Sequence, residues 1–464
     1  GIDPFPSKTP RTCSISAIMQ NFDAVAQSEE TVILAGRIRS IREHGGSAFF
    51  HFEDESGALQ GYVKRDSVGE KDYGIFLDVF DIGDIVELKG TLFTTKKGEK
   101  TLLVSSFRML SKALLPLPDK WHGLQDVEER FRKRYLDLLM NGDVRQIFKK
   151  RSKIIEELRK FLYSESFMEV ETPILQQIPG GARAKPFKTR LNALEIDLYL
   201  RVAPELYLKR LLVGGFERVF EIARCFRNEG MDATHNPDFT QVELYAAYRD
   251  YIWMMDFVEK ILAILADKVL GALEIEYEHK KVNFTPPFKK IEFADGIKEH
   301  TGIDIWSASD DAIREFLKKH GNIMTKKETR ANLIDELYKE FVKKNLIQPT
   351  FVVHLPLELN PLAKAADDRR KAERFQLIAG GIELVNAFSE LNDPEEQEKR
   401  LKEEIKQYPE QAKRVDRDFL EALEHGMPPA AGMGMGIDRL AMLFTNSHTV
   451  REVILFPTMR PKKS

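Results

Sequence analysis

Three short runs decide the fold class of this chain: Arg227-Asn228-Glu229-Gly230, His235-Asn236-Pro237-Asp238-Phe239 and Glu243-Leu244-Tyr245. Residues two apart on a strand point from the same face, so an arginine with a glutamate, and then a glutamate with a tyrosine, predict a hairpin that displays polar groups over one surface. A guanidinium forks onto phosphate or carboxylate, and a phenyl ring can stack on a base. The pattern therefore predicts a nucleotide site. The alternative is a surface hairpin with a solvated ion pair and a phenylalanine in the core.

Length and composition predict two or three globular domains. The chain has 464 residues, 43% of them hydrophobic and 31% charged, with a net charge of -3. Any nucleic acid must therefore be bound by local basic patches. Cys13 and Cys225 lie far apart without metal-binding spacing, which predicts a reducing cytoplasm and excludes a disulfide framework. No apolar run reaches the roughly 20 residues that a membrane span needs, so we expect no membrane partner.

Residues 29–112 are predicted to form the first domain. Five β-rich runs, at 32–41, 47–54, 58–66, 84–93 and 101–110, are separated by turn signals such as Gly45-Gly46 and Lys96-Lys97-Gly98. Five strands in about eighty residues are typical of an OB-fold barrel, and a barrel without a ligand is the alternative. Residues 113–142 are predicted as a linker. Its basic run at 130–134 is either a solvated helix face or a tRNA backbone contact.

The second domain is predicted over residues 143–464. It begins with helical spacing of apolar residues, followed by an extended run that is closed by Pro173, and residues 250–345 are predicted as a helical insertion. Near the end, Gly432, Gly434 and Gly436 alternate and lead into Arg439. This imitates a dinucleotide fingerprint, but no acidic residue about twenty positions on supports that interpretation. Alternating glycines on a strand instead let a nucleotide lie against bare backbone.

These runs resemble the three motifs of the class II aminoacyl-tRNA synthetases, and the RNEG, HNPDF and ELY runs are similar to those of the bacterial lysyl-tRNA synthetases. The resemblance covers nearly the whole chain after residue 30. It implies an α+β protein with an N-terminal OB-fold β-barrel and an antiparallel β-sheet catalytic domain flanked by helices. It also implies a homodimer formed through the first motif. The implied reaction is ATP-dependent attachment of L-lysine to tRNA(Lys) through a lysyl-adenylate.

The resemblance assigns the ATP-binding residues. Arg227 is implied to bind the α-phosphate, Glu229 the adenine amino group, His235 the outer phosphates, Phe239 the base and Arg439 the γ-phosphate, with Arg227 and Arg439 as the catalytic pair. The substrate carboxylate is already ionised, so we expect positioning and charge neutralisation to supply the catalysis without a general base.

The amino-acid pocket is predicted around Asn386, Phe388 and Glu390, which share a strand face. A long cationic substrate needs an apolar wall for its methylenes and a carboxylate for its ammonium, and the last two supply that pair. The resemblance implies the full set: Glu390 and Tyr245 for the ε-ammonium, Gly181, Glu205 and Glu243 for the α-amino group, and Arg227 and Asn386 for the α-carboxylate. The division among the three glutamates stays open.

One position departs from the family. Glu383 matches a Mg²⁺ ligand, but its usual acidic partner seven residues earlier is Gln376, whose amide oxygen can coordinate but brings no charge. The number of Mg²⁺ ions therefore stays open.

In the barrel, four residues match family positions that read the anticodon: Arg42, Phe49, Gln60 and Glu99. An aromatic platform with polar neighbours is how OB-folds take single-stranded bases. Two rival functions remain: an enzyme that lysylates a protein, and a non-enzymatic nucleic-acid-binding regulator.

Overall fold

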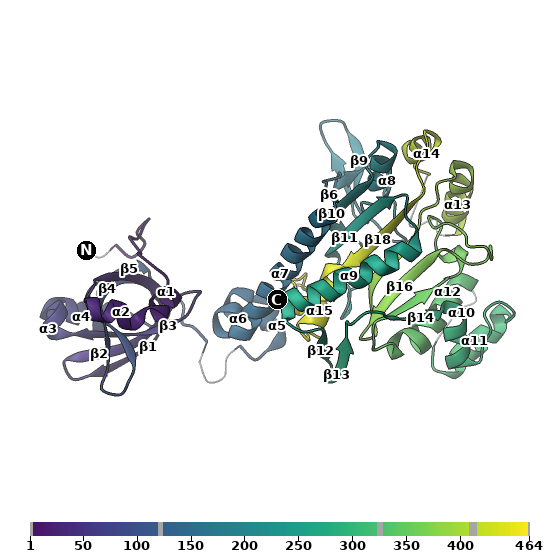
Figure 1. Ribbon diagram of the computed structural model, residues 1–464. Coiled ribbons are helices and arrows are strands. Elements are labelled where there is room, and N and C mark those ends of the chain that lie inside the picture. Colours follow the sequence, from purple (N-terminus) through teal and green to yellow (C-terminus); the bar gives the residue numbers. More distant parts are fainter. Residues whose placement is uncertain (1–2, 119–123, 323–327, 408–414, 463–464) are drawn as a thin grey trace. The chain divides into compact units, whose positions relative to one another are not determined.

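The computed structural model describes residues 3–118, 124–322, 328–407 and 415–462 (Figure 1). The chain forms two compact units, Gly1–Gln125 and Asp126–Ser464. Among the described residues, no helix is long and apolar enough to cross a membrane.

The N-terminal unit is a five-stranded closed barrel, which confirms the predicted OB-fold. Its strands are β1 (Val32–His44), β2 (Ser47–Glu53), β3 (Ala58–Lys64), β4 (Ile85–Thr94) and β5 (Lys100–Ser111), paired in the order β1-β2-β3-β5-β4. Alternate residues point into the barrel, where Leu34, Phe50 and Val86 are fully buried. Helices α1 (Ile15–Gln20) and α2 (Phe22–Ser28) precede the barrel and add Ile15 and Phe22 to its core. Helices α3 (Arg65–Val68) and α4 (Glu70–Val79) connect β3 to β4.

The second unit is built on one eight-stranded sheet, in the order β14-β15-β16-β17-β18-β11-β10-β6. The strands are β6 (Met168–Glu169), β10 (Arg218–Phe226), β11 (Asp238–Ala247), β14 (Lys289–Glu292), β15 (Thr350–Val353), β16 (Arg374–Ala379), β17 (Ile382–Ser389) and β18 (Ala430–Gly436). All neighbours from β15 to β10 are antiparallel, and only the two edge strands run parallel to their neighbours. The predicted antiparallel β-sheet flanked by helices is therefore confirmed.

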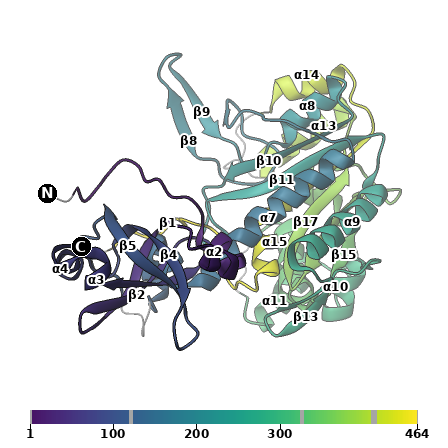
Figure 2. The ribbon, with the colours of Figure 1, turned by 60° about the vertical axis from the view of Figure 1, so that its left-hand side comes forward.

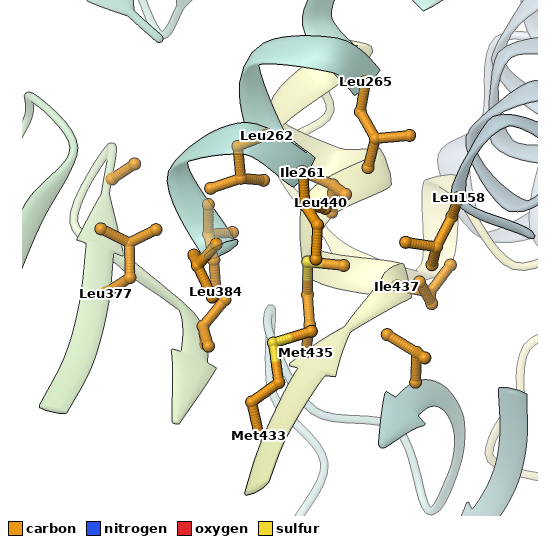
Figure 3. Close-up of a cluster of buried hydrophobic side chains, with 14 of the residues drawn as sticks. Leu158, Ile261, Leu262, Leu265, Leu377, Leu384, Met433, Met435, Ile437 and Leu440 are labelled. Carbon is orange, nitrogen blue, oxygen red and sulfur yellow. The ribbon is translucent and has the colours of Figure 1, made fainter. Parts of the chain in front are cut away.

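Three helices cover one face of this sheet: α7 (Gly142–Ser164), α9 (Tyr251–Leu270) and α15 (Ile437–Phe444) (Figure 2). Met433 and Met435 of β18 point into this layer, where they meet Ile261, Leu265 and Leu440 (Figure 3). Because successive residues of a strand point to opposite faces, the glycines that alternate with these methionines lie on the other face of the sheet.

The remaining helices and strands of this unit pack around the sheet and its helices. They are α5 (Val127–Arg132), α6 (Arg134–Met140), β7 (Leu175–Gln176), β8 (Lys188–Leu191), β9 (Ile196–Leu200), α8 (Glu205–Val213), β12 (Glu274–Tyr277), β13 (Lys280–Asn283), α10 (Phe293–Thr301), α11 (Asp310–Lys319), α12 (Arg330–Leu337), α13 (Pro394–Gln407) and α14 (Arg417–Glu424). In the basic run at 130–134, Arg134 is buried and donates to the backbone carbonyls of Arg451 and Leu455.

The segment 250–345 differs from the predicted helical insertion, because it also contains strands β12, β13 and β14, and β14 completes the edge of the main sheet. These strands are only four residues long, too short for an alternating pattern to stand out from the neighbouring helices. Residues 323–327 of the segment lie outside the described residues.

Candidate active site

The floor of the site is a glycine strand between two strands that carry side chains. The pairing of β17, β18 and β11 produces two rows across the sheet, Phe388–Gly432–Tyr245 and Asn386–Gly434–Glu243. A Cβ at Gly432 would collide with Oε1 of Glu390 and with the ring of Tyr245. The missing side chain at Gly432 therefore leaves room for the Glu390 and Tyr245 side chains to lie over bare backbone, and a nucleotide against the glycine strand stays a prediction.

The rows open into one cavity of about 640 Å³. Its wall contains thirteen of the predicted site residues: Gly181, Glu205, Arg227, Glu229, His235, Phe239, Glu243, Tyr245, Gln376, Glu383, Asn386, Phe388 and Arg439. Among the site residues predicted in the second unit, Glu390 alone is not part of the wall. It lies behind the wall at 1% exposure, next to Gly432. The structure thus brings together residues from strands β11, β16 and β17, helices α8 and α15, and several loops that are up to 258 positions apart in the sequence, Gly181 and Arg439 being the extremes.

Two residues that the sequence analysis missed orient the predicted ones. Gln241 Nε2 donates to Glu243 Oε1 at 2.5 Å, and the Tyr245 hydroxyl donates to Oε2 of the same carboxylate at 3.2 Å. On the other side, Arg374 Nε donates to Asn386 Oδ1 at 2.8 Å. This fixes the amide with its NH₂ group as the end available to an incoming carboxylate. Gln241 could have been found from the sequence, because it is two and four residues before Glu243 and Tyr245 and so shares their face of the strand.

One end of the cavity holds three buried carboxyl groups. Burial raises the pKa of Glu205, raises that of Glu243 well above its usual range, and raises the pKa of Glu390 to about 8. Gly181 adopts a left-handed φ of +89°, and a Cβ there would lie 2.8 Å from the Cβ of Glu205. Because a cation restores the ionised form of such acids, the pocket favours a positively charged ligand.

A buried lysine joins this group. Lys209 lies one helical turn after Glu205 on α8 and is 0% exposed; its Nζ is 2.7 Å from Glu205 Oε1 and 2.5 Å from Glu390 Oε2. Burial opposes its charge, but the two carboxylates hold the pKa of Lys209 above its usual range. The sequence analysis missed this residue. The glutamate–lysine spacing of four was its only local signal.

The other end of the cavity is cationic. Arg439 Nη2 donates to His235 Nε2 at 3.0 Å, and His235 Nδ1 lies 2.8 Å from Asp232 Oδ2. The guanidinium of Arg227 lies over the ring of Phe239, 4.9 Å from its centroid. Burial lowers the pKa of Arg227. Arginine and histidine groups that converge in this way can bind a polyphosphate.

The predicted hairpin needs one correction. Arg227 and Glu229 do not lie on a strand, because β10 ends at Phe226 and its last pair is Phe226 with Asp238. The backbone N–H of Arg227 instead donates to the carbonyl of Pro237, and that of Asn228 to the carbonyl of Lys185. The loop backbone therefore has partners outside the ladder, and these hold both side chains at the cavity wall.

A β-bulge brings Glu383 to the site. Its position in β17 has the parity of the core residues Val385 and Ala387, but the register with β16 shifts between Leu377 and Ile378, and the carboxylate lines the cavity. One extra residue in a strand turns the following side chains to the other face.

The residues at this point offer oxygen ligands that suit a cation. Gln376 Nε2 donates to Glu383 Oε2 at 3.1 Å, which leaves Gln376 Oε1 buried without a hydrogen-bond partner. Carboxylate and amide oxygens are ligands that Mg²⁺ accepts. The ammonium of Lys343 is 3.8 Å from Glu383 Oε2 and adds a positive charge. Within the described part of the chain, no group of three or more His, Cys, Asp or Glu side chains could hold a metal.

In the barrel, the four predicted anticodon residues lie on or next to its outer surface. Arg42 pairs with Phe49 across β1 and β2, and Phe49 is half-buried while its neighbour Phe50 fills the core. The Phe49 ring stacks on Tyr62 at 4.4 Å, and Tyr62 is followed by Phe93 at 6.1 Å.

The polar members of this set lie beside the aromatic stack. Gln60 accepts a hydrogen bond from Thr101 at 2.9 Å, and Glu99 is exposed in the turn between β4 and β5. Tyr62 and Phe93 extend the aromatic platform, and the sequence analysis missed both although their alternation with core residues pointed outward.

Comparisons with known proteins agree with this architecture. Residues 126–460 match the family model of tRNA synthetases class II (D, K and N), and residues 32–110 match that of the OB-fold nucleic acid binding domain. The fold and the site together place the chain in the class II aminoacyl-tRNA synthetases.

The relatives narrow this class. The lysine–tRNA ligase of Thermotoga maritima is 46% identical over 100% of this chain and 93% of the relative, and that of Halalkalibacterium halodurans is 47% identical over 100% and 94%. The lysine–tRNA ligase of Thermoanaerobacter sp. is 48% identical over 100% and 92%. Within the class, the chain belongs to the lysine–tRNA ligase family.

Proposed function

We propose that this protein attaches L-lysine to tRNA(Lys) in an ATP-dependent reaction that passes through a lysyl-adenylate. The observation that carries the proposal is the pocket beside Gly432, where three buried acids surround an apolar wall and adjoin a cationic cleft. An acidic, apolar pocket suits a long side chain that ends in an ammonium. A cationic cleft suits a triphosphate.

At the amino-acid end, Phe388 packs along the methylenes of the substrate, and Glu390 with Tyr245 receives the ε-ammonium. Glu205, Glu243 and Gly181 bind the α-amino group. Arg227 and the NH₂ group of Asn386 bind the α-carboxylate. The role of Asn386 is supported by Arg374, which donates to the side-chain oxygen of Asn386 and leaves its NH₂ group to donate to the substrate carboxylate.

In the first step, an oxygen of the lysine carboxylate forms a bond to the α-phosphorus while the bond to the bridging oxygen breaks, so pyrophosphate leaves. The carboxylate is ionised at neutral pH, and no residue needs to remove a proton. Arg227 neutralises charge at the α-phosphate, while Arg439 and His235 hold the outer phosphates and Asp232 fixes the histidine. Glu229 reads the adenine amino group, and Phe239 stacks on the base.

Glu383 and Gln376 are the residues that would hold Mg²⁺. A bound ion neutralises phosphate charge and orients the leaving group. The unpartnered amide oxygen beside the carboxylate supports this assignment.

In the second step, the terminal hydroxyl of tRNA takes the lysyl group and AMP leaves. The barrel selects the tRNA, with Phe49 stacking on an anticodon base and Arg42, Gln60 and Glu99 reading its edges. The half-buried aromatic stack on the outer barrel face supports this role.

We also propose that the enzyme is a cytoplasmic homodimer. From the last turn of α7 onward, four exposed apolar side chains lie within thirteen residues: Tyr163, Met168, Ile174 and Leu175. Exposed apolar side chains gathered in one short segment support a protein interface there. Translation consumes charged tRNA in the cytoplasm, and both cysteines are free thiols. Measuring the mass of the protein in solution tests the dimer.

Pyrophosphate exchange with each of the twenty amino acids tests the reaction, followed by charging of tRNA(Lys). Lysine should support exchange far above the other nineteen. Exchange with lysine but transfer to a protein instead of tRNA would replace the acceptor in this proposal. Absence of exchange would leave a nucleic-acid-binding regulator.

A further inference from the structure

Lys209 is a buried cation placed among the acids that we assign to the substrate. Its Nζ is 2.7 Å from Glu205 Oε1 and 2.5 Å from Glu390 Oε2, and the rings of Phe388 and Phe419 lie 5.5 and 5.9 Å from it. A buried ammonium is costly unless it is paired, and two carboxylates within hydrogen-bond distance provide the pairing. The substrate must therefore bind carboxylates that already have a cation.

The two oxygens of Glu390 are not equivalent. Both are buried without a hydrogen bond in the described chain, but Oε2 forms the ion pair with Lys209 at 2.5 Å, whereas Oε1 lies against Gly432 and Tyr245. Gly432 and Tyr245 both belong to the cavity wall. The ion pair through Oε2 thus directs Oε1 of Glu390 toward the cavity.

We propose that Lys209 is a positioning residue of the lysine pocket, a resident ammonium that holds Glu390 by one oxygen and presents the other to the ε-ammonium of the substrate. It also keeps Glu205 and Glu390 easier to ionise, because two buried carboxylates without a cation would each retain a proton more strongly. The inference rests on the proposed role of Glu390 as the receiver of that ammonium.

The other charged groups around the pair do not replace this cation. From β11, Glu243 and Tyr245 add negative charge to the pocket when ionised, and Glu404 of α13 acts on Glu205 in the same sense. Arg374 of β16 also lowers the pKa of Glu205, but the hydrogen bond of its Nε goes to Asn386. Removing the ammonium of Lys209 therefore leaves the acids under mutual repulsion.

The test is the pH dependence of lysine binding, measured by calorimetry between pH 6.5 and 9 on the full chain. Lys209→Met keeps a similar side-chain volume and removes the charge. The pH at which lysine affinity levels off should move up by about 1–3 units, since that is the shift an adjacent opposite charge produces. At pH 7 the variant should bind lysine about tenfold or more weakly than the wild type, and the ratio should shrink several-fold between pH 8 and pH 9, where the affinity of the wild type has levelled off and that of the variant still rises.

Arg210→Met is the matched control. Arg210 is the next residue of α8 and pairs with Asp416, so its loss removes a cation and an ion pair from the same helix without touching Glu390. Its pH profile should coincide with that of the wild type. If Lys209→Met fails to fold, Lys209→Gln, which retains hydrogen-bond donors without the charge, should show the same displaced profile.

An equal loss of affinity at every pH, or an unchanged profile, would overturn the proposal and leave Lys209 a structural residue. Glu390→Gln separates this outcome from a failure of the pocket assignment. If that variant binds lysine as well as the wild type, Glu390 is not the receiver, whatever the Lys209 variants show.

Discussion

Replacing Glu390 by glutamine is the sharpest test of substrate recognition. The substitution keeps the shape of the side chain and removes its negative charge at a site that is 1% exposed. A hydrogen bond to a charged group contributes about 1.5–3 kcal/mol, which corresponds to a rise of roughly 10–150-fold in the KM for lysine. Lys209 keeps its bond to Glu205 in this variant, so the pocket retains one of its two ion pairs.

The pH dependence of the wild type supplies an independent measure. Burial raises the pKa of Glu390 to about 8, so below that pH the free pocket holds a proton that the ε-ammonium must displace. The KM for lysine should therefore fall as the pH rises from 6 to 8, by up to about tenfold per unit, and level off above pH 8. In Glu390→Gln this proton is gone, so the slope should become shallower.

The assay is pyrophosphate exchange with lysine and ATP varied in turn. Glu229→Gln is the mirror control, because its position at the adenine end predicts a raised KM for ATP and an unchanged KM for lysine. Equal rises in both constants for Glu390→Gln, or a pH slope as steep as that of the wild type, would refute the reasoning.

Four further variants test the barrel and the rest of the cavity. Phe49→Ala should weaken tRNA charging by roughly 5–150-fold, which is the effect of losing one stacked base, while pyrophosphate exchange and the unfolding temperature stay near wild type. Gln60→Ala should show the same selective defect. Normal tRNA charging by both variants would exclude anticodon reading by the barrel. Gln376→Glu should lower the Mg²⁺ concentration for half-maximal exchange because it adds a second carboxylate, and an unchanged titration would separate this position from metal use. Gly432→Ala should raise the KM for lysine, because the added methyl group would displace the Glu390 side chain. An unaltered KM would contradict the close approach of Glu390 to Gly432.

Much of the fold was predictable because its periodicity is local. The five barrel strands alternate apolar and polar residues, and Gly432, Gly434 and Gly436 alternate with core methionines, so period two alone assigned their faces. Short strands such as β14 were not predictable, since four residues are too few to show a period.

The sequence by itself determined the chemistry of the site. Its functional groups can be identified from local sequence patterns alone: the RNEG, HNPDF and ELY runs, the glycine strand and the acids of the pocket. The comparisons confirm the family that these runs indicated.

Only the tertiary structure decided which groups meet and in which state. The β-bulge that turns Glu383 toward the cavity depends on the register of β16 against β17, and the loop positions of Arg227 and Glu229 depend on backbone partners across the loop. Lys209 engages Glu390 although 181 positions separate them in the chain. Such pairs are chosen by packing between distant segments, and a local pattern cannot specify them because it contains only one member of each pair.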